Sequence, residues 1–391
     1  MGETNFKKEP LFYAGDEVRL AKKEKTRAAL EKFGLDGLLF ILPEAVRYFT
    51  DFYATGYRPF WELSYLTVVS KGRDAVLGYS SGSDDYRVRL RSLSEDIRKL
   101  PSKTSEWPKA ISEILVDYGL DKGKIGVDVF PFDLYLGLKR ECPKAEFVSA
   151  SHIWGELTAI KHPLEIEIIK EATHIAMMGM RVALGAIRTG VSEMEVSAEA
   201  EYAMRKAGSE VNPFIPVILS GEHFGTMERV ATPRIINQGD MVMVDLGCVF
   251  KGYVGEFGRT TIVGKANGEQ RKMYRTVVDS LKKAIEFVKP GMKCSELDSL
   301  VREVIREAGY GKYEHKRATG HQLGYGLHGH PIIGPGVDYE IRPNMVINLE
   351  PRIQIYDNPT MGGVHIEDTL LVTEKGIEVL TTFKYDEELL Q

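Results

Sequence analysis

The stretch MVMVDLGCVFKGYVGEFGRTTIVG, residues 241–264, predicts two β-strands joined by a tight turn. Asp245 lies on the first strand and Glu256 on the second. A turn centred between residues 250 and 251 makes the two carboxylates direct neighbours, whereas a Lys-Gly turn one residue later makes them diagonal neighbours. In either register their Cβ atoms lie within roughly 5–8 Å. Two carboxylates this close in an apolar hairpin indicate a bound cation, unless one of them points to solvent or pairs with a neighbouring base.

A second pair of strand-like segments, NMVINLEPRI (344–353) and GGVHIEDTLLVT (362–373), repeats this arrangement. We expect them to form one hairpin joined by the loop QIYDNPTM. Glu350 ends the apolar run of the first segment, and strand alternation places His365 and Glu367 on one face of the second. The alternative for Glu350 is an exposed carboxylate at the end of a strand.

Three histidines lie between the two hairpins, in the glycine-rich segment ATGHQLGYGLHGHPIIG (318–334). Glycine lets the backbone approach a ligand closely, and imidazole complements a site made mainly of oxygen ligands. We predict His321 as the metal ligand and leave His328 and His330 to contact the substrate. The predicted ligand set for two divalent ions is Asp245, Glu256, His321, Glu350 and Glu367.

The chain also contains an internal echo, by which we mean two segments with the same spacing of glycines and the same order of helix and strand. The interval from Gly190 to Gly208 equals that from Gly291 to Gly309, and each interval predicts a capped amphipathic helix that precedes a Met-Val strand ending in a carboxylate. We interpret the echo as a duplication that gives a pseudo-twofold domain. The alternative is a coincidence between two ordinary helices.

The length of 391 residues fits two domains, which we place at residues 1–155 and 156–391. In the first, helical and strand patterns alternate, with the last strand at residues 124–130, and this predicts an α/β domain. It has no glycine-rich phosphate loop, which argues against a nucleotide site. The second domain is predicted to be α+β and to contain the catalytic site.

Composition excludes several classes of partner. The net charge is −5, with Lys and Arg interleaved with Glu, which argues against nucleic acid. No apolar run approaches the roughly 18 residues that cross a bilayer, so we expect no membrane partner. The three widely spaced cysteines do not predict a disulfide framework, and we expect a cytoplasmic location.

These motifs resemble the pita-bread metallohydrolases: methionine aminopeptidase, aminopeptidase P, prolidase and creatinase. The resemblance is carried by DLGCVFKGY, TGHQLGYGLH, NMVINLEP and GGVHIEDTLLVTEKG, and in the linker by LTAIKHPLEIEIIKEA. It implies a pita-bread catalytic domain behind a creatinase/prolidase-like α/β domain, and a homodimer. It also implies two divalent ions (Mn, Co, Fe or Zn), with Glu350 as a ligand that shuttles protons and His328 as a hydrogen-bond donor to the scissile carbonyl.

Three positions depart from the family pattern. Glu256 stands where an Asp is usual, Glu228 stands at a usual histidine position, and Gly329 replaces a usual Glu. These departures suggest an altered substrate, and we assign Glu228, His330 and His365 to the substrate site. We also assign Arg58, in the segment ATGYRPFWE (54–62), to a contact with a substrate carboxylate; the alternative is an aromatic packing loop with a surface arginine.

The leading hypothesis is therefore a dinuclear Xaa-Pro dipeptidase or aminopeptidase that cleaves a small peptide before proline. The alternative is a creatinase-like C–N hydrolase of a small amide, amidine or cyclic amidine, with a degenerate or absent metal site. A third reading is a binding protein without catalytic activity.

Overall fold

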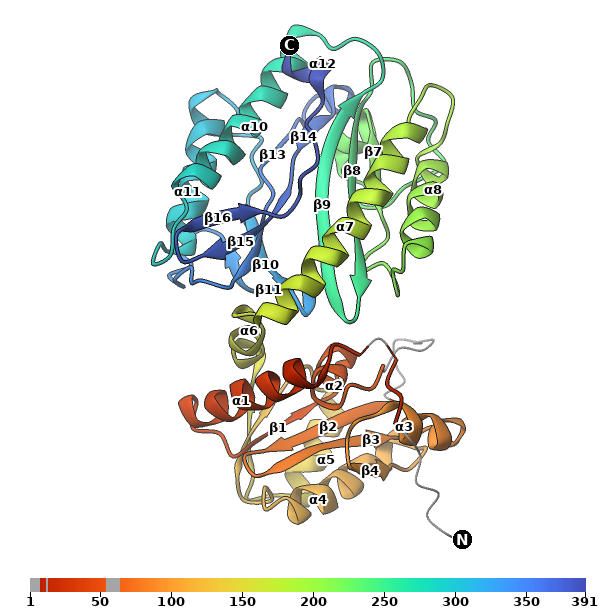
Figure 1. Cartoon of the computed structure of the whole chain (residues 1–391), viewed down its shortest axis with the longest axis vertical. Coiled ribbons are helices and arrows are strands. Elements are labelled where there is room, and N and C mark those ends of the chain that lie inside the picture. Colours follow the sequence, from red (N-terminus) through yellow and green to blue (C-terminus); the bar gives the residue numbers. More distant parts are fainter. Residues whose placement is uncertain (1–7, 12, 54–63) are drawn as a thin grey trace. The chain divides into compact units, whose positions relative to one another are not determined.

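The computed structural model describes residues 8–11, 13–53 and 64–391. The chain divides into two compact units, Met1–Leu157 and Thr158–Gln391, each described by itself (Figure 1). Across the described residues, no helix combines the length and apolar character needed to cross a bilayer.

The N-terminal unit is built on a six-stranded mixed sheet with the strand order β4-β3-β2-β1-β5-β6. Its strands are β1 (Gly37–Phe40), β2 (Tyr65–Ser70), β3 (Arg73–Tyr79), β4 (Asp96–Lys99), β5 (Lys124–Val127) and β6 (Glu146–Ser149). Its helices are α1 (Asp16–Lys32), α2 (Pro43–Thr50), α3 (Asp85–Arg91), α4 (Trp107–Asp117) and α5 (Phe132–Glu141), with α6 (Ser151–Ala159) leading out of the unit. The predicted α/β class is confirmed, but the series continues through α5 and β6 beyond the strand predicted to be the last.

The first half of the C-terminal unit packs two long helices against a three-stranded sheet. The helices are α7 (Pro163–Ala186) and α8 (Glu193–Lys206), and the sheet contains β7 (Val217–Ser220), β8 (Met241–Phe250) and β9 (Tyr253–Ile262). A short helix, α9 (Glu222–Thr226), follows β7. A shared hydrophobic core of α7, α8 and strand residues holds this half together.

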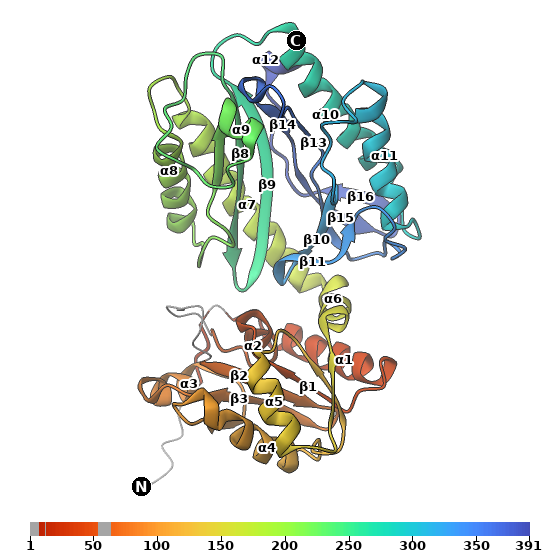
Figure 2. The ribbon, with the colours of Figure 1, turned by 180° about the vertical axis from the view of Figure 1, so that it is seen from behind.

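The second half repeats the arrangement of a helix pair on a sheet. The helices are α10 (Gly268–Phe287) and α11 (Cys294–Glu307), and the sheet has the order β11-β10-β12-β15-β16. These strands are β10 (Gly320–Gly324), β11 (Gly326–Ile333), β12 (Val346–Leu349), β15 (Asp368–Thr373) and β16 (Gly376–Val379), and α12 (Glu387–Leu390) ends the chain. In both views the two helix pairs lie on opposite outer sides with the strands between them (Figures 1 and 2).

The second predicted hairpin is wrong in one respect, because it is divided between two sheets. β12 pairs with β15, whereas β13 (Arg352–Gln354) pairs with β14 (Gly363–His365) in a separate two-stranded sheet. Pro351 lies at the break and has no backbone N–H for a continuous ladder.

The helices predicted in the two echoed segments are α8 and α11, each of 14 residues. Gly208 and Gly309 follow these helices with positive φ values of 110° and 91°, the backbone conformation of a helix-terminating glycine. Duplication of the two halves stays a prediction.

Close packing of α7 on β9 depends on Gly255. A Cβ atom at this position would lie 2.3 Å from the backbone carbonyl carbon of Ala172 in α7. Gly255→Ala is therefore expected to lower the free energy of unfolding by about 1–3 kcal/mol, measured by urea denaturation. Gly185→Ala is the matched control, because a Cβ there meets nothing within 4 Å and alanine favours the helix. Equal stability of the two variants would contradict this packing.

Candidate metal centre

The first hairpin turns at Lys251 and Gly252, which both have positive φ (48° and 84°). Two such residues form the primed turn that matches the twist of a two-residue hairpin. The resulting register pairs Asp245 with Gly258 and Gly247 with Glu256. Of the two registers that the sequence leaves open, the structure therefore has the diagonal one.

A buried arginine holds the second half of the site against the first. Arg259 follows Gly258 on β9, and its guanidinium donates to the Glu367 carbonyl oxygen at 2.7 Å and to the Asp368 carboxylate at 2.7 Å. The Glu367 N–H donates in turn to the Gly258 carbonyl oxygen at 3.0 Å. These bonds fix Glu367 beside the hairpin that carries Asp245.

Glu256, His321 and Glu367 form one buried ligand group. The His321 Nε2 atom lies 3.3 Å from the nearer Glu256 carboxylate oxygen and 3.9 Å from a Glu350 oxygen. The Asn348 amide nitrogen donates to Glu256 at 2.8 Å and to Glu367 at 2.6 Å. Asn348 thus holds two ligand carboxylates at a fixed separation.

Asp245, His365 and Glu367 form a second group that could hold a metal ion, and it shares Glu367 with the first. The His365 Nε2 atom lies 3.5 Å from a Glu367 carboxylate oxygen and 3.9 Å from an Asp245 oxygen. Two groups with one common carboxylate are an arrangement suited to two neighbouring ions.

The pKa values of three carboxyl groups in this centre are raised far above their ordinary values. Burial, followed by the charge of Glu367, raises the pKa of Asp245 and of Glu256 well above the ordinary values. Burial, followed by the charge of Glu350, does the same to the pKa of Glu367. Burial lowers the pKa of His321 to about 4, so its imidazole is neutral, the form that binds metal. Such a crowd of buried anions with neutral imidazole fits divalent cations.

The centre lies in the wall of a cavity of about 600 Å³. Four of its carboxylates line it: Asp245, Glu256, Glu350 and Glu367. The remaining walls combine apolar with basic side chains, namely Phe214, Ile215, Val217, Met227, Val230, Ala318, Leu327, Ile332, Arg229, Arg317, Arg352, His315, His321 and His328, together with Gly320. The cavity lining therefore combines the acidic side chains of the candidate centre with basic side chains.

The predicted site residues are placed as follows. All five predicted ligands line the cavity, as does His328, whose ring meets that of His321 at a centroid distance of 4.6 Å. Glu228 and His330 are exposed and are not among the lining residues. His365 is buried next to the ligands, and Arg58 lies outside the described residues. The roles assigned to these residues stay predictions.

Sequence reasoning missed Asn348 and the three arginines of the cavity. Asn348 lies inside the quoted strand segment, where a polar side chain among Val, Ile and Leu was the available signal. Arg352 lies two residues beyond Glu350, and both line the cavity. Arg229 and Arg317 lie in loops, for which periodicity gives no signal.

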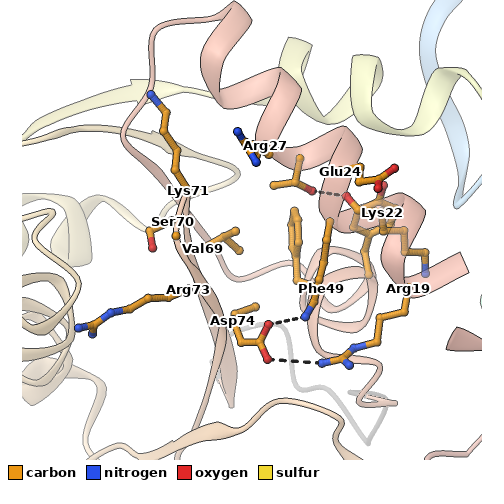
Figure 3. Close-up of a pocket in the computed structure, with 15 residues that line it drawn as sticks. Arg19, Lys22, Glu24, Arg27, Phe49, Val69, Ser70, Lys71, Arg73 and Asp74 are labelled. Carbon is orange, nitrogen blue, oxygen red and sulfur yellow. Dashed lines mark hydrogen bonds and ion pairs between the residues drawn. The ribbon is translucent and has the colours of Figure 1, made fainter. Parts of the chain in front are cut away.

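A second cavity, of about 360 Å³, lies in the N-terminal unit between α1 and the β2–β3 hairpin (Figure 3). Its lining includes no histidine, and Asp74 is ion-paired with Lys23 and Arg19. Within the described residues it holds none of the ligand groups suited to a metal ion. The candidate metal centre is therefore the one in the wall of the C-terminal cavity.

Comparison with known proteins agrees with this centre. The profile of Metallopeptidase family M24 matches residues 167–374, which span the whole ligand set. The chain belongs to this metallopeptidase family. The profile of the Creatinase/Prolidase N-terminal domain matches residues 22–158. The fold is therefore the pita-bread fold behind a creatinase/prolidase-type domain, and the family implies divalent metal ions, which the donor set fits.

Individual relatives cover most of the chain. A Xaa-Pro dipeptidase of Pyrococcus horikoshii is 36% identical over 306 residues, 78% of this chain and 83% of that protein. A Xaa-Pro dipeptidase of Pyrococcus furiosus is 38% identical over 259 residues, 66% of this chain and 73% of that protein. The solved structure of a Xaa-Pro dipeptidase from Bacillus anthracis superposes with a TM-score of 0.81 at 30% identity, covering 94% of this chain and 98% of that one.

The buried carboxylates predict how the stability of the metal-free protein depends on pH. Because the folded-state pKa values of Asp245, Glu256 and Glu367 are raised, their contribution to stability is fully present below their ordinary pKa values and is lost as the pH rises through the folded values. His321 acts in the opposite sense, but only below its ordinary pKa of 6.5. In urea unfolding with a chelator present, the free energy of unfolding should therefore fall, relative to a variant without these carboxyl groups, as the pH rises from their ordinary pKa values toward the raised folded values.

The matched control is the triple variant Asp245→Asn, Glu256→Gln, Glu367→Gln, which cannot titrate at these positions. Its free energy of unfolding should fall less steeply over the same pH range. Identical slopes for the two proteins would contradict the raised pKa values.

Proposed function

We propose that this metallopeptidase is a dinuclear Xaa-Pro dipeptidase. The observation that carries the proposal is the cavity that Asp245, Glu256, Glu350 and Glu367 line together with Arg352. The relatives named Xaa-Pro dipeptidase support the choice of bond. A dipeptide fits this cavity because it offers a scissile carbonyl for the metal centre and a free carboxylate for an arginine.

The proposed metal ligands are Asp245, Glu256, His321, Glu350 and Glu367, for two ions of Mn, Co, Fe or Zn. Bound there, such ions polarise a carbonyl group and make water a nucleophile near neutral pH. Supporting this assignment, carboxylate oxygens from both halves of the unit converge around Glu367, and imidazole nitrogens complete the donor set.

Glu350 and His328 are the proposed proton-transferring and hydrogen-bonding groups. Glu350 lines the cavity with its carboxylate partly exposed, so it can take a proton from the attacking water and deliver it to the leaving nitrogen. Burial, followed by the charge of His321, lowers the pKa of His328. A neutral His328 keeps one ring N–H, which can donate to the oxygen that gains negative charge.

Arg352 is the proposed anchor for the substrate carboxylate. Its Nε atom is buried without a hydrogen-bond partner, and no carboxylate of the described residues lies within ion-pair distance of its guanidinium. Burial lowers the pKa of Arg352, because the cost of desolvating its guanidinium exceeds the favourable effect of the Glu350 and Asp245 charges. A bidentate bond to the carboxylate of a bound dipeptide would offset this cost.

Two further proposals concern the whole chain. We infer a homodimer from the resemblance of the N-terminal domain to the creatinase and prolidase branch, whose members pair through it. A cytoplasmic location is supported by the three cysteines, which are free and buried. The domain division at residues 155 and 156 remains a proposal, as does a substrate contact by Arg58.

The function is tested by a substrate panel on the full-length protein. Xaa-Pro dipeptides should be hydrolysed, and Xaa-Pro-Yaa tripeptides should be turned over much more slowly because their carboxylate lies further from the scissile bond. A chelator should abolish the activity, and Mn, Co or Zn should restore it. Glu350→Gln should lower kcat by at least about 100-fold, whereas Glu374→Gln, at an exposed turn, should not.

Turnover of creatine-like or cyclic amidine compounds, without any turnover of Xaa-Pro substrates, would favour the creatinase-like alternative. Full activity of metal-free protein would exclude the proposed mechanism. Preference for longer peptides would assign an aminopeptidase instead of a dipeptidase.

Arg352 provides a sharper test of the dipeptide preference. Arg352→Ala is expected to raise KM for a Xaa-Pro dipeptide by about 10- to 100-fold, the equivalent of a lost charge-assisted hydrogen bond. The same variant should leave KM for the corresponding dipeptide amide nearly unchanged, because the amide has no carboxylate to bind. Equal losses for dipeptide and amide would show that Arg352 acts only on the structure of the site.

A further inference from the structure

Two hydrogen bonds with the Thr260 hydroxyl hold the backbone of His365 in place. Its N–H donates to the Thr260 hydroxyl oxygen at 2.9 Å, and that hydroxyl donates to the His365 carbonyl oxygen at 2.8 Å. Thr260 lies on β9, and His365 ends β14. The ring therefore projects from a fixed point toward the strand pair that carries Asp245.

The imidazole ring of His365 lacks hydrogen-bond partners in the part of the chain that the structure describes. The residue is 1% exposed, and neither ring nitrogen has a partner among the described residues. A buried polar ring left in this state costs free energy, so such groups in native proteins have an explanation. The substrate is a poor explanation, because His365 is not among the residues that line the cavity.

The distances around the ring indicate a shared cation. Its Nε2 atom lies 3.5 Å from a Glu367 oxygen and 3.9 Å from an Asp245 oxygen, which is long for hydrogen bonds to this nitrogen. Two ligand atoms each bonded at about 2.0–2.2 Å to one ion lie roughly 3–4 Å apart. Both distances from the ring therefore fall in this range, and one ligand atom from each of the three residues lies within 4.8 Å of the other two.

Gly258 provides the space that the ring occupies. It pairs directly with Asp245 across the hairpin, and a Cβ atom there would lie 2.5 Å from the His365 Cδ2 atom and 2.6 Å from its Nε2 atom. The ring thus packs on the backbone of the residue opposite Asp245. Glycine at this position permits imidazole and carboxylate to approach the same point.

We propose that His365 is a metal ligand, whose Nε2 atom binds the ion held by Asp245 and Glu367. This inference rests on the proposed dinuclear site and replaces the assignment of His365 to the substrate. It gives each ion one imidazole, with His321 serving the ion held by Glu256 and Glu367. A second nitrogen donor favours ions that bind imidazole well, such as Zn and Co, over Mn.

The test is metal binding by the full-length, metal-free protein. Equilibrium dialysis with Zn²⁺ should show two ions per chain in the wild type. His365→Gln should weaken one of the two sites at least tenfold and leave the other unchanged. His328→Gln is the matched control, because it removes an imidazole of the same cavity that is not a proposed ligand, and it should leave both affinities unchanged.

A spectroscopic readout counts the coordinated imidazoles directly. Pulsed electron paramagnetic resonance of the Cu²⁺-loaded protein should show coordination by two imidazoles per chain in the wild type and one in His365→Gln. His365→Cys offers another ligand for Zn²⁺ and should recover the lost Zn²⁺ affinity, which a merely structural role would not predict. Urea unfolding without metal checks that each variant folds.

The two proposals fail in different ways. If the wild type binds two ions and His365→Gln binds them equally tightly with the same imidazole count, His365 is not a ligand and the dinuclear site stands. If the wild type binds no divalent ion, both proposals are overturned. If both ions are bound with two imidazoles but no Xaa-Pro substrate is hydrolysed, the His365 assignment stands and the proposed peptidase function falls.

Discussion

The mutual repulsion of buried carboxylates around Glu367 is the constraint on which the C-terminal unit depends. Glu367 belongs to both ligand groups, so Asp245 on one side and Glu256 on the other must each approach the same anion. Such an arrangement is unfavourable in a folded chain unless protons or cations compensate it. The hydrophobic cores between the helix pairs and the strands provide the rigidity that holds these anions together.

Two polar side chains transmit that rigidity to the centre. Arg259 connects β9 to the backbone at Glu367 and to the Asp368 carboxylate, and it is only 2% exposed. Asn348 donates from a single amide nitrogen to Glu256 and Glu367. Removing one partner of a buried ion pair costs about 3–5 kcal/mol of folding stability. A substitution of Arg259 or Asp368 is therefore expected to disrupt the site. Neither residue needs to contact the substrate to be essential for the geometry.

The sequence predicted most of the centre because its ligands lie at ends of strong apolar patterns. Asp245 and Glu256 are recognisable from one hairpin, and only its turn remained ambiguous until the positive φ values of Lys251 and Gly252 selected the register. The position of His365 was harder to foresee. Strand alternation places it with Glu367, but β14 ends at His365 and the chain continues into a different sheet.

Contacts between residues far apart in the sequence limit how much of the site can be predicted from the sequence. Asn348 contacts Glu256 across 92 positions of sequence, and periodicity within one strand gives no information about such a partner. His328 and His330 look equivalent in the glycine-rich segment, yet only His328 lines the cavity. The choice between them depends on how β11 pairs with β10, where the register shifts twice. Irregular pairing of this kind has no local sequence pattern.

The surroundings of Glu256 explain how the site accommodates a glutamate where the family pattern has an aspartate. Its partner across the hairpin is Gly247, and a Cβ atom there would lie 2.9 Å from the Glu256 Cβ atom. Glycine at position 247 therefore leaves room for the Glu256 side chain, and the Asn348 amide nitrogen donates to the Glu256 carboxylate at 2.8 Å. A shorter Asp at this position would withdraw the carboxylate from Asn348 by about one C–C bond and leave a buried amide hydrogen without its acceptor. Glu256 is thus matched to Gly247 and Asn348, which supports its proposed role as a metal ligand.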